Sequence, residues 1–232
     1  MKKTKETVCE FIRELIEDYE KVQSEIKEKF NVEVKLPEDY EIRQVCEYLM
    51  DIREYDEELY KHSIAVSFWS VYIGEIIGLN QKEMTELFVA SSLHDIGKLL
   101  VPEDIIKKAN KLEEVEKRII ETHPSFGVYY ISYKKMVVWA LSHNRTILNI
   151  IEQHHEALNG RGYPNQLVGQ QIGTGARIVA IADKFEAYGA KRIYHEERSL
   201  EDTIEFLNRQ ANDGIIDKDI LSEFIKKLQK KG

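Results

Sequence analysis

Two short segments of this 232-residue chain place histidine and aspartate side chains at spacings that suit divalent cations. The first is His94-Asp95-Ile96-Gly97-Lys98, and the second begins with the pair His154-His155 and runs on to Tyr163-Pro164. Neighbouring imidazole and carboxylate groups supply the nitrogen and oxygen ligands of a cation that activates water. The two segments therefore predict metal-dependent hydrolysis.

Further candidate ligands lie on or at the ends of predicted helices. Glu58 and His62 are four residues apart in a segment with helical periodicity, so their side chains lie on one face, one turn apart. His123 precedes a proline at a predicted helix boundary. Asp183 lies in an otherwise apolar helix, where an unpaired buried carboxylate is costly and a cation would remove that cost.

Each of these residues alone has a simpler explanation. A single histidine is more often a core or surface residue than a ligand, which is how we interpret His143. Glu58 lies in a charged stretch that is typical of a solvated surface, and Asp183 could be a structural cap. The set favours a metal site, because five of the seven histidines fall in the segments above, together with three acids.

The overall composition limits the class of protein. A formal net charge of −8 argues against a broad basic face for DNA or RNA, but leaves a small anionic substrate open because bound cations can make a pocket positive. Cys9 and Cys46 have no ligand-like spacing, which indicates reduced thiols. The longest wholly apolar run, 178–182, is too short to span a bilayer. We expect a cytoplasmic protein that binds neither a nucleic-acid polymer nor a membrane.

The N-terminal residues predict one long helix followed by a linker. Apolar side chains recur there at alternating steps of four and three: Val8, Ile12, Leu15, Tyr19, Val22 and Ile26. Such a seam either covers its own domain or pairs with a second copy in a homodimer, and Phe11 and Ile16 widen the stripe in favour of the first alternative. Residues 31–37 alternate in polarity, which indicates a linker or a short extended piece. We therefore divide the chain into residues 1–38, with a dimerisation role left open, and a catalytic domain over 39–232.

The rest of the chain has helical periodicity and no convincing sheet, so the predicted fold class is all-α. A proline at 102 and a glycine at 97 occupy a helix entrance and the position after a helix end. The predicted helices cover 39–53, 57–78, 81–95, 103–110, 113–121, 124–132, 145–156, 173–188, 199–211 and 217–229.

Taken together, the motifs resemble the HD-GYP domain, a branch of the HD phosphohydrolase superfamily that hydrolyses cyclic di-GMP. Residues 94–98 are similar to the family's HDxGK segment and His123-Pro124 to its HP segment, while 154–156 and 159–164 resemble its HHE and GYP segments. We call residues 159–164 the GYP loop. Residues 101–103 and 176–183 also resemble family stretches, and the likeness covers about 56–230.

This resemblance implies an HD-domain helical bundle, here with an N-terminal helical extension, that encloses two or three divalent cations, iron or manganese. Glu58 matches an acid that only some members have, where it helps to hold a third cation. The implied ligands are Glu58, His62, His94, Asp95, His123, His154, His155 and Asp183.

The resemblance also implies residues for catalysis and substrate binding. Asp95 and Lys98 take the catalytic positions, and Lys98 faces the substrate as a charge partner or proton donor. The GYP loop borders the site and can serve as a docking surface for a diguanylate cyclase (GGDEF) domain. The implied substrate-binding residues are Lys98, Arg161, Tyr163, Arg192 and Tyr194.

A few positions depart from the family pattern without removing a predicted ligand. Asn159 stands where an aspartate is usual, and Glu186 stands where a second aspartate commonly follows Asp183. Lys191, Ile193 and His195 replace more frequent residues around Arg192. These departures bear on substrate affinity and choice rather than on metal binding.

The functional expectation is hydrolysis of cyclic di-GMP to pGpG, GMP or both by a metal-activated hydroxide. Bound cations raise the nucleophilicity of water and neutralise the phosphate oxygens, which are the two requirements of phosphodiester hydrolysis. One alternative is a cyclic di-GMP sensor or adaptor with little turnover that docks a GGDEF partner. Another is an HD phosphohydrolase that acts on a different cyclic dinucleotide or nucleotide.

Overall fold

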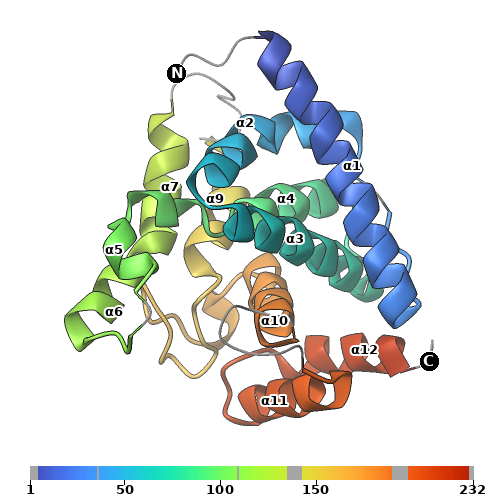
Figure 1. Ribbon diagram of the computed structural model, residues 1–232. Helices are drawn as coiled ribbons and strands as arrows, with labels where there is room; N and C mark the ends of the chain where they lie inside the picture. Colours follow the sequence, from blue (N-terminus) through green and yellow to red (C-terminus); the bar gives the residue numbers. More distant parts are fainter. Residues whose placement is uncertain (1–4, 36, 109, 135–142, 190–197, 230–232) are drawn as a thin grey trace.

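The computed structural model describes residues 5–35, 37–108, 110–134, 143–189 and 198–229, and these ranges fold almost entirely into helices (Figure 1). No strand occurs in them, and the β-type pairing that they contain is an isolated antiparallel bridge between Asn159 and Val168. The all-α prediction is therefore confirmed. No helix in the described ranges has the length and apolar character that crossing a membrane requires.

The N-terminal helix α1 (Lys5–Phe30) covers one side of the molecule (Figure 1). Its apolar stripe packs against α2 (Asp39–Tyr55) and α3 (Glu57–Ile77), with Leu15 and Tyr19 almost completely buried. In the linker, Val32 and Val34 are buried and their neighbours are exposed, as the alternating pattern predicts. The seam is thus used within the chain, which is the first of the two alternatives, and homodimerisation through it stays an untested prediction.

The centre of the fold is α3, which contacts α1, α2, α4 (Gln81–Ser92), α10 (Thr174–Gly189) and α12 (Lys218–Gln229). Because its side chains are apolar nearly all round, this helix is stable only when it is enclosed by others. The Asp56 side chain accepts a hydrogen bond from the Leu59 amide at its start, and Gly78 ends it with a positive φ of 78°. These local signals fix where the helix places His62.

The short elements beside the centre end earlier than the sequence pattern predicts. The helix predicted over 81–95 ends at Ser92, and the chain turns before the 3₁₀ helix η1 (Ile96–Leu100). Similarly, the helix predicted over 103–110 is α5 (Glu103–Ile106), followed by α6 (Glu114–Ile120) and α7 (His123–Tyr133). The turn is required because η1 packs closely on α7: a Cβ atom on Gly97 would lie 1.9 Å from the His123 carbonyl oxygen.

The remaining helices complete the bundle. α9 (Arg145–Gln153) packs against α4, α7 and α10. The 3₁₀ helix η2 (Gly169–Gln171) lies in the loop before α10, and α11 (Leu200–Asn212) follows α10. The Trp69 and Phe185 rings are 4.7 Å apart between centroids, and Phe30 and Phe224 pack on both of them. One aromatic cluster therefore joins the end of α1 to α3, α10 and α12.

Candidate metal centre

The structure brings seven of the sequence-predicted ligands together in the interior, although they come from five separate parts of the chain. His62 lies on α3, and His94 with Asp95 follows α4. The remaining ligands lie at the start of α7, at the end of α9 and on α10: His123, His154, His155 and Asp183. All seven side chains are buried except that of His155, which is partly exposed.

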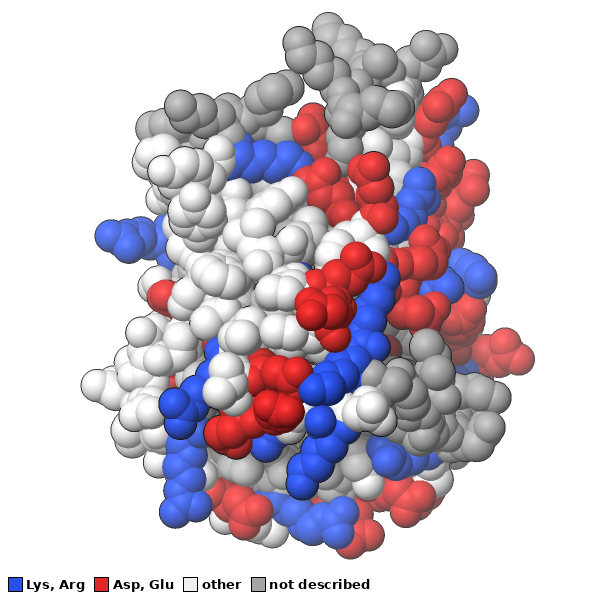
Figure 2. All heavy atoms as spheres, turned by 60° about the vertical axis from the view of Figure 1, so that its left-hand side comes forward, with Lys and Arg blue, Asp and Glu red and all other residues white. Residues whose placement is uncertain are grey.

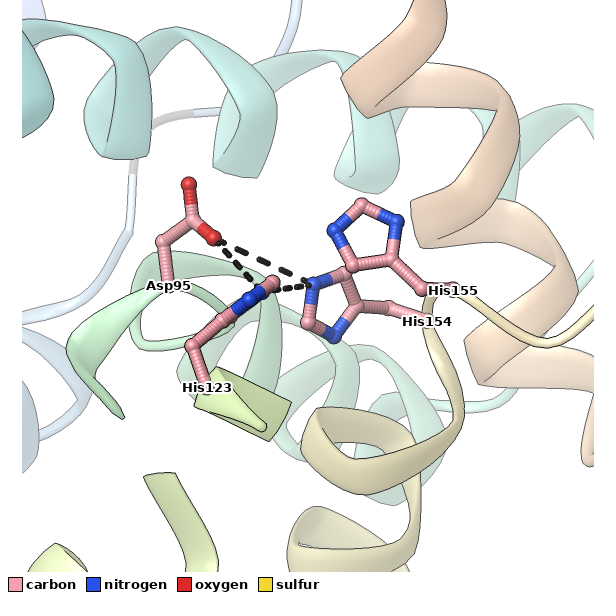
Figure 3. Close-up of side chains that lie close together, drawn as sticks. All are labelled: Asp95, His123, His154 and His155. Carbon is pink, nitrogen blue, oxygen red and sulfur yellow. Dashed lines mark hydrogen bonds and ion pairs between the residues drawn. The ribbon is translucent and has the colours of Figure 1, made fainter. Parts of the chain in front are cut away.

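Asp95 stands between two groups of imidazoles. Its Oδ1 atom is 3.1 Å from His123 Nε2 and 3.9 Å from His154 Nε2, as the dashed lines in Figure 3 show. The other oxygen, Oδ2, is 3.4 Å from His94 Nε2 and 3.7 Å from His62 Nε2. A carboxylate whose two oxygens face separate nitrogen groups has the arrangement of a ligand that bridges two cations.

These distances define two candidate cation subsites. The α9 subsite is formed by Asp95, His123, His154 and His155, whose ligand atoms all lie within 4.8 Å of one another (Figure 3). The α3 subsite is formed by His62, His94 and Asp95 together with Asp183, whose Oδ1 atom is 3.2 Å from His62 Nε2 and 4.0 Å from His94 Nε2.

Main-chain carbonyls orient three of the imidazole rings. The Nδ1 atoms of His94, His123 and His154 lie 2.8, 2.8 and 2.6 Å from the carbonyl oxygens of the residues three positions earlier, Ser91, Ile120 and Ile151. Because a carbonyl only accepts, Nδ1 must carry the proton and Nε2 is left with its lone pair directed at the centre. The local helix ends thus select the tautomer that a cation needs.

His62 is oriented by a carboxylate instead. Its Nδ1 atom makes a close contact with Oε2 of Glu186, which lies one turn after Asp183 on α10. Glu186 was noted as a departure from the family pattern but was not predicted as a site residue. Its spacing of three from Asp183 was the available signal, since residues three apart share a helix face.

In the centre, burial and nearby opposite charges shift the pKa values of the ionisable side chains in opposite directions. Burial would raise the pKa of Asp95, but Lys98 and the surrounding imidazoles hold that pKa well below its usual value. The pKa of Asp183 is likewise lowered by the neighbouring imidazoles, chiefly His62, against the effect of burial. For His62, burial lowers the pKa, but Glu186 and Asp183 outweigh it and raise the pKa to about 10.

Two buried atoms of the centre make no hydrogen bond, namely His94 Nε2 and Asp95 Oδ1. A buried polar atom without a partner costs roughly 1–3 kcal/mol, so such atoms are rare unless something else satisfies them. Coordination to a cation would satisfy both atoms at once. The residues therefore fit divalent metal ions, because imidazole nitrogens and carboxylate oxygens are both cation ligands.

Lys98 and the GYP loop lie at the edge of the centre. Lys98 Nζ is 2.5 Å from Asp95 Oδ2, and the lysine side chain is 24% exposed, so it faces both the centre and solvent. The Tyr163 ring lies against the His155 ring with 4.9 Å between centroids. The Arg161 side chain is exposed on the outer part of the loop.

Hydrogen bonds to Glu156 and Asn159 hold the GYP loop in place. The Glu156 carboxylate, 4% exposed, accepts hydrogen bonds from the Asn165 and Leu167 amides at 2.6 and 2.9 Å. Asn159 Nδ2 donates to the Asp213 carbonyl at 2.8 Å, so this departure from the family pattern has a structural role. The HHE glutamate is therefore a clamp for the loop.

Other predicted site residues are not brought into the centre by the described structure. The Glu58 side chain is 67% exposed and pairs with Lys61 at 3.1 Å, one turn of α3 away from the buried His62. The described structure thus offers no observation in favour of a third cation at Glu58. Arg192 and Tyr194 lie outside the described residues, as do Lys191, Ile193 and His195.

Figure 2 shows that the side of the molecule bearing α5 and α6 carries interspersed acidic and basic side chains beside a broad uncharged area. No continuous basic surface is visible there among the residues that the structure describes.

Comparisons with known proteins identify relatives of the chain. The sequence model described as "HD domain" matches residues 17–220.

The cyclic di-GMP phosphodiesterase response regulator RpfG of Xanthomonas campestris is 36% identical over 141 residues, which cover 60% of this chain and 35% of that protein. The cyclic di-GMP phosphodiesterase of Thermotoga maritima is 33% identical over 160 residues, or 68% of this chain and 42% of that protein. The 3'3'-cGAMP-specific phosphodiesterase 1 of Vibrio cholerae is 31% identical over 172 residues, or 73% and 38%. The chain thus spans roughly a third to two fifths of these relatives' lengths.

Solved structures show the same fold. Bd1817, an HDG"Y"P protein from Bdellovibrio bacteriovorus, has a TM-score of 0.59 at 20% identity and covers 91% of this chain and 70% of its own. The HD domain of the phosphodiesterase PgpH from L. monocytogenes, in complex with cyclic-di-AMP, has a TM-score of 0.55 at 19% identity and covers 78% and 94%. At these identities the likeness concerns the arrangement of helices.

Proposed function

This chain belongs to the HD domain family, in its HD-GYP branch, and on that premise we propose that it is a metal-dependent phosphodiesterase that hydrolyses a cyclic dinucleotide. The observation that carries the proposal is Asp95, whose two carboxylate oxygens face two separate groups of imidazoles. This arrangement suits hydrolysis, which needs an activated water and neutralised phosphate oxygens.

Asp95 and Lys98 would have different roles in this hydrolysis. When bound, two cations supply a water of lowered pKa and neutralise charge on the phosphate. Asp95 holds the two subsites at a fixed separation because its carboxylate serves both. Lys98, which reaches Asp95 from a partly exposed position, is placed to neutralise a phosphate oxygen or to give a proton to the leaving oxygen.

For the substrate, we propose cyclic di-GMP, converted to pGpG, GMP or both. The support is the naming of the relatives in Xanthomonas campestris and Thermotoga maritima as cyclic di-GMP phosphodiesterases. A relative in Vibrio cholerae is named as specific for 3'3'-cGAMP, so this substrate is the main competitor. The choice depends on side chains around the phosphates and bases, including Arg192 and Tyr194, for which we propose substrate contacts.

The decisive experiment measures turnover by protein loaded with Mn²⁺ or with Fe²⁺ under anaerobic conditions. Cyclic di-GMP, 3'3'-cGAMP and cyclic di-AMP are supplied in parallel, and products are identified by chromatography. We expect cyclic di-GMP to have the highest kcat/KM and the Asp95→Asn variant to lose at least 10³-fold in kcat. Unchanged turnover in this variant would refute the centre.

A matched control separates loss of the centre from loss of the fold. Asp217 is also a buried carboxylate, but its partner is Arg177 at 2.8 Å, which lies six residues before Asp183 on α10. The Asp217→Asn variant should lose stability and keep its turnover per folded molecule. Saturable binding of the nucleotide with no product from the metal-loaded wild type would instead favour a sensor or adaptor that docks a GGDEF domain.

A further inference from the structure

The imidazole rings of the centre are held in two chemically different ways. In the α9 subsite, the rings of His123 and His154 are backed by neutral carbonyls, and so is His94 in the α3 subsite. Only His62, among the rings with an identified Nδ1 partner, is backed by an anion, the carboxylate of Glu186. The two subsites therefore differ in the groups behind their ligands.

Packing of the surrounding helices fixes the position of Glu186 relative to His62. The Glu186 side chain is 13% exposed, and it lies on α10 one turn after Asp183, so a single helix supplies the two carboxylates nearest to His62. Phe185, next to it in sequence, is locked in the aromatic cluster with Trp69. The backbone that carries Glu186 is thereby fixed against α3, which carries His62.

The subsites also differ in their directly facing carboxylates. The α3 subsite has Asp95 and Asp183, whereas the α9 subsite has Asp95 together with three imidazoles. A carboxylate that accepts the Nδ1 proton fixes the ring and makes Nε2 a stronger donor than a carbonyl does. Loss of such a partner typically costs about 10- to 100-fold in metal affinity.

We infer that Glu186 is a positioning residue of the centre, and that by binding His62 Nδ1 it raises the intrinsic cation affinity of the α3 subsite, which is the affinity once the proton displaced from His62 is accounted for, without changing that of the α9 subsite. The inference rests on the proposed metal centre. A merely structural Glu186 would change the stability of the fold when replaced, but it would not change one cation affinity relative to the other.

The test is a competition titration of Mn²⁺ between a chelator of known affinity and the full chain, which resolves the two binding steps and is repeated between about pH 6 and 8 so that each step is corrected for the protons it displaces. Glu186→Ala removes both the charge and the hydrogen bond, while Glu186→Gln keeps an acceptor and removes the charge. Glu186→Asp keeps the charge on a shorter side chain. Glu25→Gln is the matched control, because Glu25 is an exposed carboxylate that lines the same hollow beside α1 as Glu186.

We expect the intrinsic affinity of the α3 step to weaken about 10- to 100-fold in Glu186→Ala, less in Glu186→Gln, and least in Glu186→Asp. The α9 step should stay within twofold of its wild-type value in all three variants, and Glu25→Gln should match the wild type in both steps. To assign the steps, Asp183→Asn should impair the α3 step and His154→Ala the α9 step.

Several outcomes would overturn the inference. They are equal weakening of both steps, selective weakening of the other step, or unchanged affinities in Glu186→Ala. An anomalous scattering map that places a cation directly on a Glu186 oxygen would also overturn it, because the residue would then be a ligand. Failure of the wild type to bind any cation would instead refute the metal centre itself, so the two failures are distinguishable.

Discussion

The protonation of individual residues decides whether the centre can accept cations. Without a cation, His62 can donate from Nδ1 to Glu186 and from Nε2 to Asp183, and these two acids raise its pKa to about 10. Burial and neighbouring imidazoles lower the pKa of His154 and of His155 well below the usual value, so both are neutral at pH 7. Without a cation, His62 in the α3 subsite therefore carries a proton that a cation must displace. In the α9 subsite, His154 and His155 are neutral and can coordinate a cation directly.

This difference predicts proton release on metal binding. Because the pKa of His62 in the cation-free protein is raised to about 10, its Nε2 proton must leave at any lower pH before the nitrogen can coordinate. The apparent affinity of the α3 subsite for Mn²⁺ should therefore rise roughly tenfold per pH unit between about pH 6 and 8.

Calorimetry in buffers of different ionisation enthalpy measures the protons released. We expect about one proton from His62 for the cation in the α3 subsite, and the His62→Ala variant should lose this proton together with the site. An affinity that does not change over this pH range would contradict the protonated state of His62.

At the scale of elements, close packing of η1 on α7 sets the position of Asp95. A Cβ atom at residue 97 would lie 1.9 Å from the His123 carbonyl oxygen and 2.4 Å from the Gly127 amide nitrogen, and both of these are backbone atoms. The glycine of the HDxGK segment is therefore explained by the approach of two elements rather than by a special backbone angle.

The Gly97→Ala variant should consequently push η1 away from α7 and separate Asp95 from His123. Overpacking of this kind typically costs about 1–3 kcal/mol in the free energy of unfolding. Thermal unfolding and the cation content of the folded protein check both effects. The control is Gly173→Ala, whose added Cβ would lie 3.6 Å from Gln153 Oε1, an ordinary contact, and should change neither.

Glu156 connects two elements, because it lies just after α9 and binds the segment that follows the GYP loop. Replacing it with alanine leaves the backbone amides of Asn165 and Leu167 without their acceptor, and since both hydrogen bonds are partly buried the loss is about 1 kcal/mol each. We expect faster amide hydrogen exchange over residues 159–168 and a rise in KM that exceeds the fall in kcat.

A matched control for Glu156→Ala is Gln171→Ala, which removes an acceptor from the exposed Val168 amide in the same region. It should leave exchange around the metal centre unchanged. If Glu156→Ala changed kcat alone, the glutamate would act in the chemistry rather than as a clamp for the loop.

At the scale of the whole molecule, α1 shares one hydrophobic core with the helices that hold the ligands. Leu15 is fully buried, and Tyr19 OH lies 3.3 Å from both Ser67 on α3 and Ser92 on α4. Both of these helices carry or precede predicted ligands. The N-terminal helix is therefore part of the support of the centre.

We predict that Leu15→Ala lowers the free energy of unfolding by about 2–5 kcal/mol, because it opens a cavity in this shared core. Unfolding should remain a single transition in which α1 and the rest of the chain unfold together. Circular dichroism and sedimentation measure both points. A variant that dissociates a dimer without losing stability would show instead that α1 serves assembly.

Much of the chain could be predicted from the sequence because the relevant signals are local. The helical periodicity around His62 and Asp183, the caps, and the ligand types in 94–98 and 154–155 depend on residues a few positions apart. The all-α class followed from them, and together with the family resemblance they named eight candidate ligands, of which seven meet at the centre. The early end of α4 did not, because it depends on the contact between Gly97 and α7.

Only the tertiary structure decided how the ligands divide between two subsites. Which oxygen of Asp95 faces which imidazole, why Glu186 rather than Glu58 lies beside His62, and how Glu156 holds the loop all depend on distances between residues far apart in the chain. Residue types and local spacing specify which donor atoms are available. The packing of helices specifies where those atoms meet, because a side chain's partners across the core leave no periodic trace in the sequence.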